Sequence, residues 1–139
     1  MPSNPERGLL DTSTFIHSER VASPGDSLPA QVCLSAITLA ELSLGPLLVD
    51  DPAERARRQQ HVQLAAEVEM LPFDAACAQM FAPIAAHLHA EGGKRRARAF
   101  DALIAATAIA NGLPLYTGNS KDFEGIPGLD LRPVPVPAA

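Results

Sequence analysis

Tryptophan is absent from this 139-residue sequence, and aromatic residues make up only 4% of it. A hydrophobic core must therefore rest on leucine, isoleucine, valine and alanine, which is feasible because 47% of the residues are hydrophobic. No apolar run approaches the roughly 20 residues that a membrane helix needs. Residues 1–8 also lack the apolar stretch of a signal peptide. These absences predict a cytoplasmic, globular protein with no membrane segment.

Cysteine is scarce as well. Cys33 and Cys77 lack C-x-x-C spacing and lie in apolar runs, which predicts two reduced, buried thiols. The net charge of −5 argues weakly against a protein coated in basic residues for nucleic acid. The basic residues are clustered, however, so an RNA-binding face is not excluded.

The length predicts a single domain over residues 1–139, with a core at about 8–134 and a proline-rich, extended tail at 133–139. Short apolar segments typical of buried strands alternate with helical patterns. The predicted strands are 8–13, 31–35, 69–72, 114–117 and 129–134, and the predicted helices are 37–48, 51–67, 75–91 and 100–110. This alternation predicts an α/β fold, with a parallel sheet covered on both faces.

Four acidic residues stand beside apolar runs: Asp11, Glu41, Asp101 and Asp122. The binding crevice of a parallel sheet lies at the carboxyl ends of its strands. Asp11 follows the first predicted strand, Glu41 lies one turn into the helix after the second, and Asp122 follows the fourth. Asp101 stands at the start of the buried helix 100–110, from which it can reach the same edge. We therefore expect the fold to gather the four acids.

Each acid taken alone has a purely structural explanation. Asp11 could cap the following helix. Residues 38–41, Thr-Leu-Ala-Glu, fit a capping box. Asp101 in a first helical turn would be favoured by the helix macrodipole. Asp122 could cap a turn or face solvent.

Taken together, the four acids favour a metal site. Carboxylates beside buried segments cost desolvation free energy, and they raise one another's pKa unless a cation keeps them ionised. Ligation by oxygen alone selects Mg²⁺, with Mn²⁺ as a substitute. Such ions orient water for attack on phosphodiesters. The sequence thus predicts metal-dependent phosphodiester hydrolysis.

Four motifs occur in an order and at a spacing that resemble the PIN domain family, and within it the VapC-type ribonuclease toxins of toxin–antitoxin pairs. They are Leu-Leu-Asp-Thr-Ser at 9–13, Leu-Ser-Ala-Ile-Thr-Leu-Ala-Glu-Leu at 34–42, Phe-Asp-Ala-Leu-Ile-Ala-Ala-Thr-Ala at 100–108 and Tyr-Thr-Gly-Asn-Ser-Lys-Asp-Phe at 116–123. The resemblance spans about 9–134. It implies a three-layer α/β/α sandwich with a central, mainly parallel five-stranded sheet, usually as a homodimer.

The resemblance also assigns roles to residues. It implies that Asp11, Glu41 and Asp101 are the core metal-binding and catalytic acids. The more variable fourth acid falls at either Asn119 or Asp122, and we assign it to Asp122 because only that position is acidic here. The supporting residues, which hydrogen-bond ligands or metal-bound water, are Thr12, Ser13, Thr117 and Asn119. Asp101 or Glu41 would assist proton removal from the attacking water.

The implied function is that of a Mg²⁺-dependent endoribonuclease toxin, cleaving structured RNA (tRNA or rRNA) and neutralised by a VapB-like antitoxin. A basic cluster forms either a phosphate clamp for RNA or an ordinary solvated surface: Lys94, Arg95, Arg96 and Arg98. The leucine-rich segment 39–49 forms either ordinary core or, as the resemblance implies, the groove for the antitoxin's C-terminal segment.

Three alternatives compete with the toxin. A haloacid-dehalogenase-type phosphatase also begins with a strand that ends in aspartate, but it needs a second aspartate where this chain has Ser13. A catalytically silent PIN binding module should have lost an acid, whereas this chain keeps all four. A PIN nuclease of RNA processing, unrelated to a toxin, stays open.

Overall fold

Five parallel strands form the centre of the fold. The computed structural model describes residues 6–18, 27–90 and 95–135, with side chains from residue 99 onward in the last range. The strands are β1 (Arg7–Leu10), β2 (Gln31–Ser35), β3 (Glu69–Leu71), β4 (Leu115–Thr117) and β5 (Leu131–Pro133), in the order β3-β2-β1-β4-β5. Every neighbouring pair is parallel, so the predicted sheet is confirmed.

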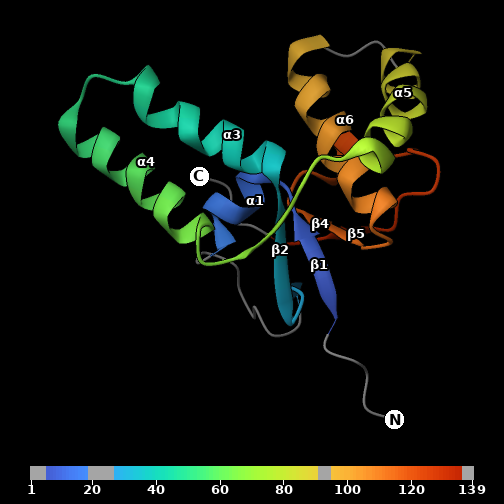
Figure 1. The fold of residues 1–139 in the computed structure, drawn as a ribbon, viewed down its shortest axis with the longest axis horizontal. Helices are drawn as coiled ribbons and strands as arrows, with labels where there is room; N and C mark the ends of the chain where they lie inside the picture. The colour runs from blue at the N-terminus through green and yellow to red at the C-terminus, as the bar shows by residue number, and fades with distance from the viewer. Residues whose placement is uncertain (1–5, 19–26, 91–94, 136–139) are drawn as a thin grey trace.

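Helices cover both faces of this sheet, as the sandwich prediction requires (Figure 1). They are α1 (Thr12–Ile16), α3 (Ala36–Leu44), α4 (Pro52–Ala65), α5 (Ala75–Ala90) and α6 (Arg95–Ala110), with 3-10 turns η2 (Gly45–Leu48) and η3 (Ser120–Phe123). Successive strand residues point to opposite faces. Leu9 therefore packs in the cluster formed with α5 and α6, whereas Leu10 packs in the cluster formed with α1, α3 and α4.

Local signals in the sequence explain where several helices begin. The side chain of Asp51 accepts a hydrogen bond from the backbone N–H of Glu54 and caps α4, with Pro52 in its first turn. The side chain of Asp74 accepts from the N–H of Cys77, which confirms the predicted cap of α5. Both cysteines are free and buried, also as predicted. None of the described helices is long and apolar enough to cross a membrane.

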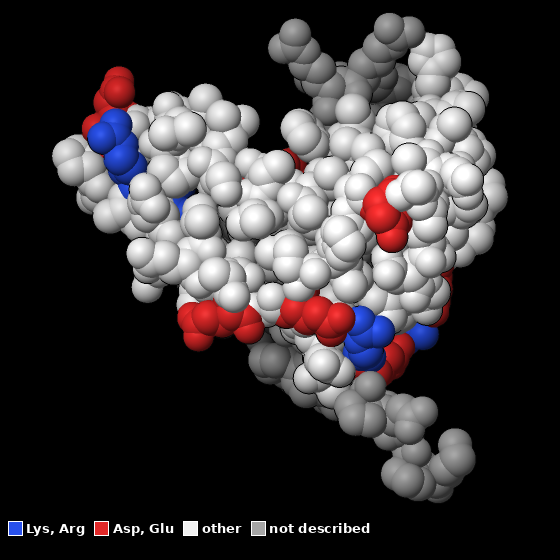
Figure 2. Space-filling view, in the orientation of Figure 1, with Lys and Arg blue, Asp and Glu red and all other residues white. Residues whose placement is uncertain are grey.

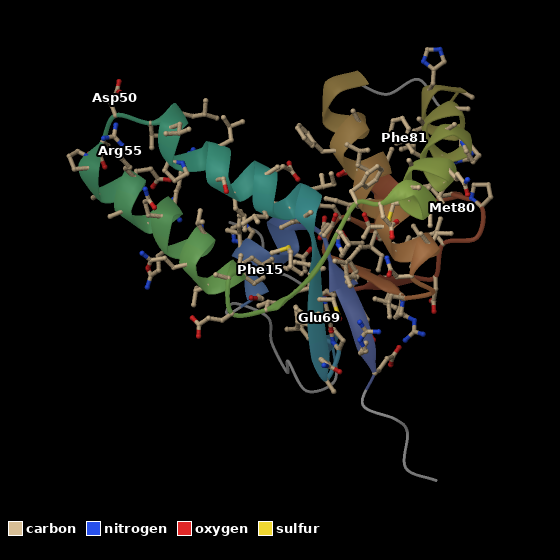
Figure 3. The ribbon with its side chains drawn as sticks, in the orientation of Figure 1. Phe15, Asp50, Arg55, Glu69, Met80 and Phe81 are labelled. Atoms are coloured by element: carbon tan, nitrogen blue, oxygen red, sulfur yellow. The ribbon has the colours of Figure 1, made fainter. Side chains whose placement is uncertain are left out.

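The helices α3 and α4 run side by side as an arm that projects from the sheet (Figure 1). Asp50 and Arg55 lie at its tip (Figure 3). The predicted continuous helix over 37–48 is wrong in its last turn, because α3 ends at Leu44 and η2 follows. Pro46 lacks an N–H, and its ring crowds the carbonyl four residues earlier, which prevents a further α-helical turn.

Two further boundaries differ from the sequence-based expectation. Strand β1 ends at Leu10, so Thr12 and Ser13 belong to α1 and not to the strand. Helix α6 begins at Arg95, because the arginines and alanines before Phe100 are themselves good helix formers. Asp101 is therefore in the second turn of α6 and not at its start, where the macrodipole would favour it.

Candidate functional site

Asp11 is the most buried acid of the predicted site. It directly follows the central strand β1 and is 4% exposed. The hydroxyl of Thr117, at the end of neighbouring β4, donates to its Oδ2 at 3.1 Å. Its Oδ1 is buried and has no hydrogen bond from any of the described residues. Although Asp11 occupies the N-cap position of α1, its side chain makes no capping bond within the described part of the chain, so capping does not explain it.

Glu41 is half-buried on α3 and is held from α1. The hydroxyl of Thr12 donates to its Oε1 across 2.6 Å. The cap of α3 is Ser35, whose hydroxyl accepts from the backbone N–H of Ile37. The capping box that the sequence offered at 38–41 is therefore wrong, since Thr38 lies inside the helix and the Glu41 carboxylate turns toward α1 instead.

The structure brings Asp11 and Glu41 within electrostatic reach of each other. Burial raises the pKa of the Asp11 carboxyl, and the hydroxyls of Thr14 and Thr117 partly oppose this. Burial also raises the pKa of Glu41; the Thr12 hydroxyl lowers it, and the negative charge of Asp11 adds to the increase. Both carboxylates are thus held in positions where their negative charge is costly.

Hydroxyl and amide groups connect α1 to the loop after β4. The backbone N–H of Gly118 donates to the Thr14 hydroxyl at 2.9 Å. The side-chain amide of Asn119 donates to the Ser13 hydroxyl at 2.9 Å, and its backbone N–H donates to the Thr117 hydroxyl at 2.9 Å. Three of the four predicted supporting residues, Ser13, Thr117 and Asn119, are thus hydrogen-bonded in series to Asp11, whereas Thr12 bonds to Glu41.

The remaining two predicted acids lie on separate elements. Asp101 is half-buried on α6. That helix is joined to the end of β2 by a 3.0 Å hydrogen bond between the hydroxyls of Thr107 and Ser35. Asp122 is exposed in η3, and its backbone N–H donates to the carbonyl of Asn119.

The donor set fits a hard divalent cation, even though it is not a complete cage. Among the described residues, no three His, Cys, Asp or Glu side chains form a group that could hold a metal ion. Mg²⁺ is often bound by one or two carboxylates together with waters and substrate phosphates. The open, buried Oδ1 of Asp11 and the neighbouring Glu41 charge suit such an ion. Metal ligation by the four acids stays a prediction.

A cavity of about 700 Å³ begins beside Glu41 and Thr12 and follows the arm. Figure 2 shows the molecular surface hollowed between the arm and the α5–α6 pair. Most of the lining is apolar and comes from α1, α3, η2 and α6, whereas α4 contributes charged residues. The lining residues are Thr12, Ile16, His17, Ala40, Glu41, Leu42, Leu44, Gly45, Leu48, Glu54, Arg57, Arg58, His61 and Phe100.

Comparison with known proteins assigns the fold to a family. The model of the PIN domain family matches residues 9–129. The chain belongs to the PIN domain family. Ribonuclease VapC5 of Mycobacterium tuberculosis H37Rv is 39% identical to it over 129 residues, covering 92% of this chain and 93% of the relative. Ribonuclease VapC8 of the same strain is 43% identical over 101 residues, covering 73% and 89%.

A solved structure supports the same assignment of the PIN domain. The crystal structure of VapBC-5 from Mycobacterium tuberculosis, a member of the VapBC family of toxin-antitoxin systems, superposes with a TM-score of 0.76. The identity is 32%, and the match covers 94% of this chain and 100% of that one. The recognition of a VapC-type PIN domain from the four motifs is therefore confirmed.

The predicted RNA-binding cluster of this PIN domain falls largely outside the described side chains. Lys94 lies outside the described residues, and Arg95, Arg96 and Arg98 are described only as backbone of α6. Two arginines line the cavity itself. Arg57 and Arg58 both donate to Glu54, at distances down to 2.6 and 2.9 Å respectively, so this carboxylate offsets part of their positive charge.

Sequence reasoning missed four hydroxyl residues in the PIN domain. Thr14, Ser35, Thr38 and Thr107 are at most 1% exposed. Their hydroxyls connect α1, α3, α6 and the loop after β4 to one another. The available signal was a hydroxyl side chain within an otherwise apolar segment, since such a group must find a partner when it is buried.

Proposed function

We propose that this chain is a divalent-cation-dependent endoribonuclease and the toxin of a VapBC-type pair. One observation carries the proposal: the buried Asp11 keeps an open carboxylate oxygen beside Glu41, at the carboxyl edge of the central strands. The relatives named ribonuclease VapC support cleavage of RNA as the reaction.

The residues divide the chemistry between them. Asp11, Glu41 and Asp101 would hold the cation, with Asp122 or Asn119 as the fourth group. When bound, a Mg²⁺ or Mn²⁺ ion supplies positive charge that offsets the carboxylates and the phosphate, and it makes water a better nucleophile. Glu41 or Asp101 would take up the proton of the attacking water. Thr12 keeps the Glu41 carboxylate in one orientation through its 2.6 Å hydrogen bond.

The proposed substrate is structured RNA, either tRNA or ribosomal RNA. Four basic residues precede Asp101 by three to seven positions, which supports a role in binding phosphates near the acids: Lys94, Arg95, Arg96 and Arg98. Aromatic residues that could stack on bases are scarce, and Phe100 is the exposed one on the cavity wall among the described residues. Recognition would therefore depend mainly on RNA shape and backbone.

The cavity along the arm is the proposed site for a VapB-like antitoxin. Its apolar lining suits the nonpolar side chains of a peptide, and Glu41 at its inner end suits a cationic one. The solved VapBC-5 relative, from a toxin-antitoxin family, supports a partner of this type. Such a segment would cover the acids and so block RNA. A homodimer, which analytical ultracentrifugation would detect, is part of the same proposal.

Cleavage of purified tRNA and ribosomal RNA tests the nuclease. We expect discrete fragments with wild-type protein in Mg²⁺ or Mn²⁺, and intact RNA in EDTA or with Asp11→Asn. Asp130→Asn, at an exposed loop residue before β5, serves as the matched control and should cleave normally. Intact RNA with wild-type, metal-loaded protein would overturn the proposal and favour a silent PIN binding module.

Growth of the bacterial host distinguishes a toxin from an RNA-processing nuclease. Expression of the wild-type chain should arrest growth, and co-expression of a cognate VapB-like antitoxin should restore growth. Asp11→Asn should not arrest growth at the same protein level. RNA cleavage in vitro without growth arrest would favour the processing nuclease.

A further inference from the structure

The third residue of α3, Thr38, occupies an unusual position for a threonine. Its side chain is completely buried, and it precedes Glu41 by three residues, so both lie on the same face of α3. Its Oγ1 is 3.0 Å from the Oγ1 of Thr12 on α1. The same Thr12 oxygen is 2.6 Å from Glu41 Oε1. Thr12 is thus shared between an acid of the site and a buried hydroxyl.

The number of protons and lone pairs on each group shows how Thr38, Thr12 and Glu41 are hydrogen-bonded. A threonine hydroxyl has one proton and two lone pairs, and an ionised carboxylate can only accept. The hydroxyl of Thr12 donates to Glu41 Oε1 at the shorter distance and to Thr38 Oγ1 at the longer one, so its single proton is shared between the two acceptors. Thr38 Oγ1 is thus the second acceptor that holds the Thr12 hydroxyl.

Structural explanations for Thr38 fit the observations less well. It does not cap α3, because Ser35 does. It does not bond to Glu41 as a capping box would, because that carboxylate bonds to Thr12. A threonine kept only for packing would not need its hydroxyl to face another hydroxyl in a buried site, where an apolar isostere would fit without the cost of burying a polar group.

We propose that Thr38 is a positioning residue for the cation site. Through the hydrogen bonds that join Thr38 to Thr12 and Thr12 to Glu41, it fixes the Glu41 carboxylate with Oε2 toward the cation site. The inference rests on the proposed function. Thr38 supplies the acceptor that helps to hold the Thr12 hydroxyl in its rotamer, and Thr12 in turn orients the acid. Groups in this outer layer typically alter metal affinity or activity by about 10–100-fold when they are removed.

Direct Mn²⁺ binding to the RNA-free protein, measured by electron paramagnetic resonance of the free ion, tests the inference without relying on activity. Thr38→Val keeps the shape and removes the hydroxyl, and we expect its Mn²⁺ Kd to rise about tenfold or more. Thr38→Ser keeps the hydroxyl, and its Mn²⁺ Kd should stay within about threefold of the wild-type value. Equal Mn²⁺ Kd values for Thr38→Val and wild type, or equal losses in Thr38→Ser and Thr38→Val, would overturn it.

A double-mutant cycle with Thr12→Val separates positioning from a general structural effect. If Thr38 acts through Thr12, adding Thr38→Val to Thr12→Val should change Mn²⁺ affinity no further. Additive losses of Mn²⁺ affinity in the two variants would overturn the inference. This test holds even if Thr38→Val lowers the stability of the protein. In RNA cleavage, we expect Thr38→Val to reduce kcat and leave KM for RNA unchanged. A wild-type protein that neither binds Mn²⁺ nor cleaves RNA would instead refute the proposed function itself.

Discussion

Ser35 and Thr107 place their hydroxyl oxygens 3.0 Å apart in the buried interior and so join the end of β2 to α6. Glu41 follows Ser35 by six residues on α3, and Asp101 precedes Thr107 by six residues on α6. Each acid is thus about 9 Å along its helix from this junction. This pair of hydroxyls therefore helps to set the relative position of two helices that each carry an acid.

Removal of this junction should destabilise the protein and weaken the site. Ser35→Ala eliminates both the cap of α3 and the bond to Thr107, and we expect a loss of about 1–3 kcal/mol in the free energy of unfolding. Thr107→Val keeps the cap and should cost less. Urea denaturation measures both variants. A Ser35→Ala protein as stable as wild type would show that the junction contributes nothing.

Asp11 should reduce the stability of the metal-free protein at neutral pH. Burial raises its pKa above the value in the unfolded chain. The folded state therefore holds the proton more tightly, and stability falls as the pH rises from the unfolded-state value through the raised one. Asp11→Asn should raise the Tm in EDTA at pH 7 and give no increase near pH 3, whereas added Mg²⁺ should stabilise wild type only.

Glu69 provides a control of opposite sign. Its hydrogen bond from Arg7, 2.6 Å long, holds the pKa of this carboxyl below its ordinary value. Its contribution to stability is therefore present at neutral pH and is lost as the pH falls. Glu69→Gln should lower the Tm at pH 7, where Asp11→Asn raises it. A fall in Tm for both variants would contradict the assignment of Asp11 as an acid that burial destabilises.

The fourth position of the site can be decided by a pair of variants. Asn119 is bonded to Ser13 and Thr117, the latter of which donates to Asp11, whereas Asp122 is exposed in η3. We expect Asn119→Ala to reduce kcat for RNA cleavage by about tenfold or more, as loss of an outer-layer partner does. Asp122→Asn should have the smaller effect. The reverse order would restore Asp122 as the fourth ligand.

Antitoxin binding should depend on Leu48 more than on Leu47. Both belong to η2 and are 66% and 80% exposed, but only Leu48 is among the residues that line the cavity. Leu48→Ser should weaken binding of the VapB-like partner by about tenfold, a loss of more than 1 kcal/mol that marks a residue carrying binding energy. Leu47→Ser should change the Kd less than about threefold, and titration calorimetry measures both. Equal losses would place the antitoxin on the outer surface of the arm.

The sequence was sufficient for the sheet and for the family, because short apolar strands and the motifs around the acids are local patterns. It was insufficient where partners come from distant elements. The capping box at 38–41 is a sound local pattern, but Thr12, from another helix, binds Glu41 instead. The predicted helix over 100–110 begins too late, because Arg95 already begins α6.

Close packing at the amino end of β1 gives a final prediction. A Cβ at Gly8 would be 2.5 Å from Tyr116 Cε1 and 2.9 Å from Pro29 Cβ. The ring of Tyr116 has little room to move, since Arg132 lies over it at 5.9 Å from the centroid. Gly8→Ala should therefore lower the free energy of unfolding by about 1–3 kcal/mol.

Gly45 supplies the matched control for this substitution. It has helical dihedral angles of −48° and −53°, and a Cβ there would lie 3.4 Å from Arg58 Cδ, an ordinary van der Waals contact. Gly45→Ala should be neutral or stabilise by up to about 1 kcal/mol, because alanine loses less backbone entropy in a helix. Urea denaturation of the two variants separates the predictions. If both lost stability equally, the cost would come from the backbone and not from the contact with Tyr116.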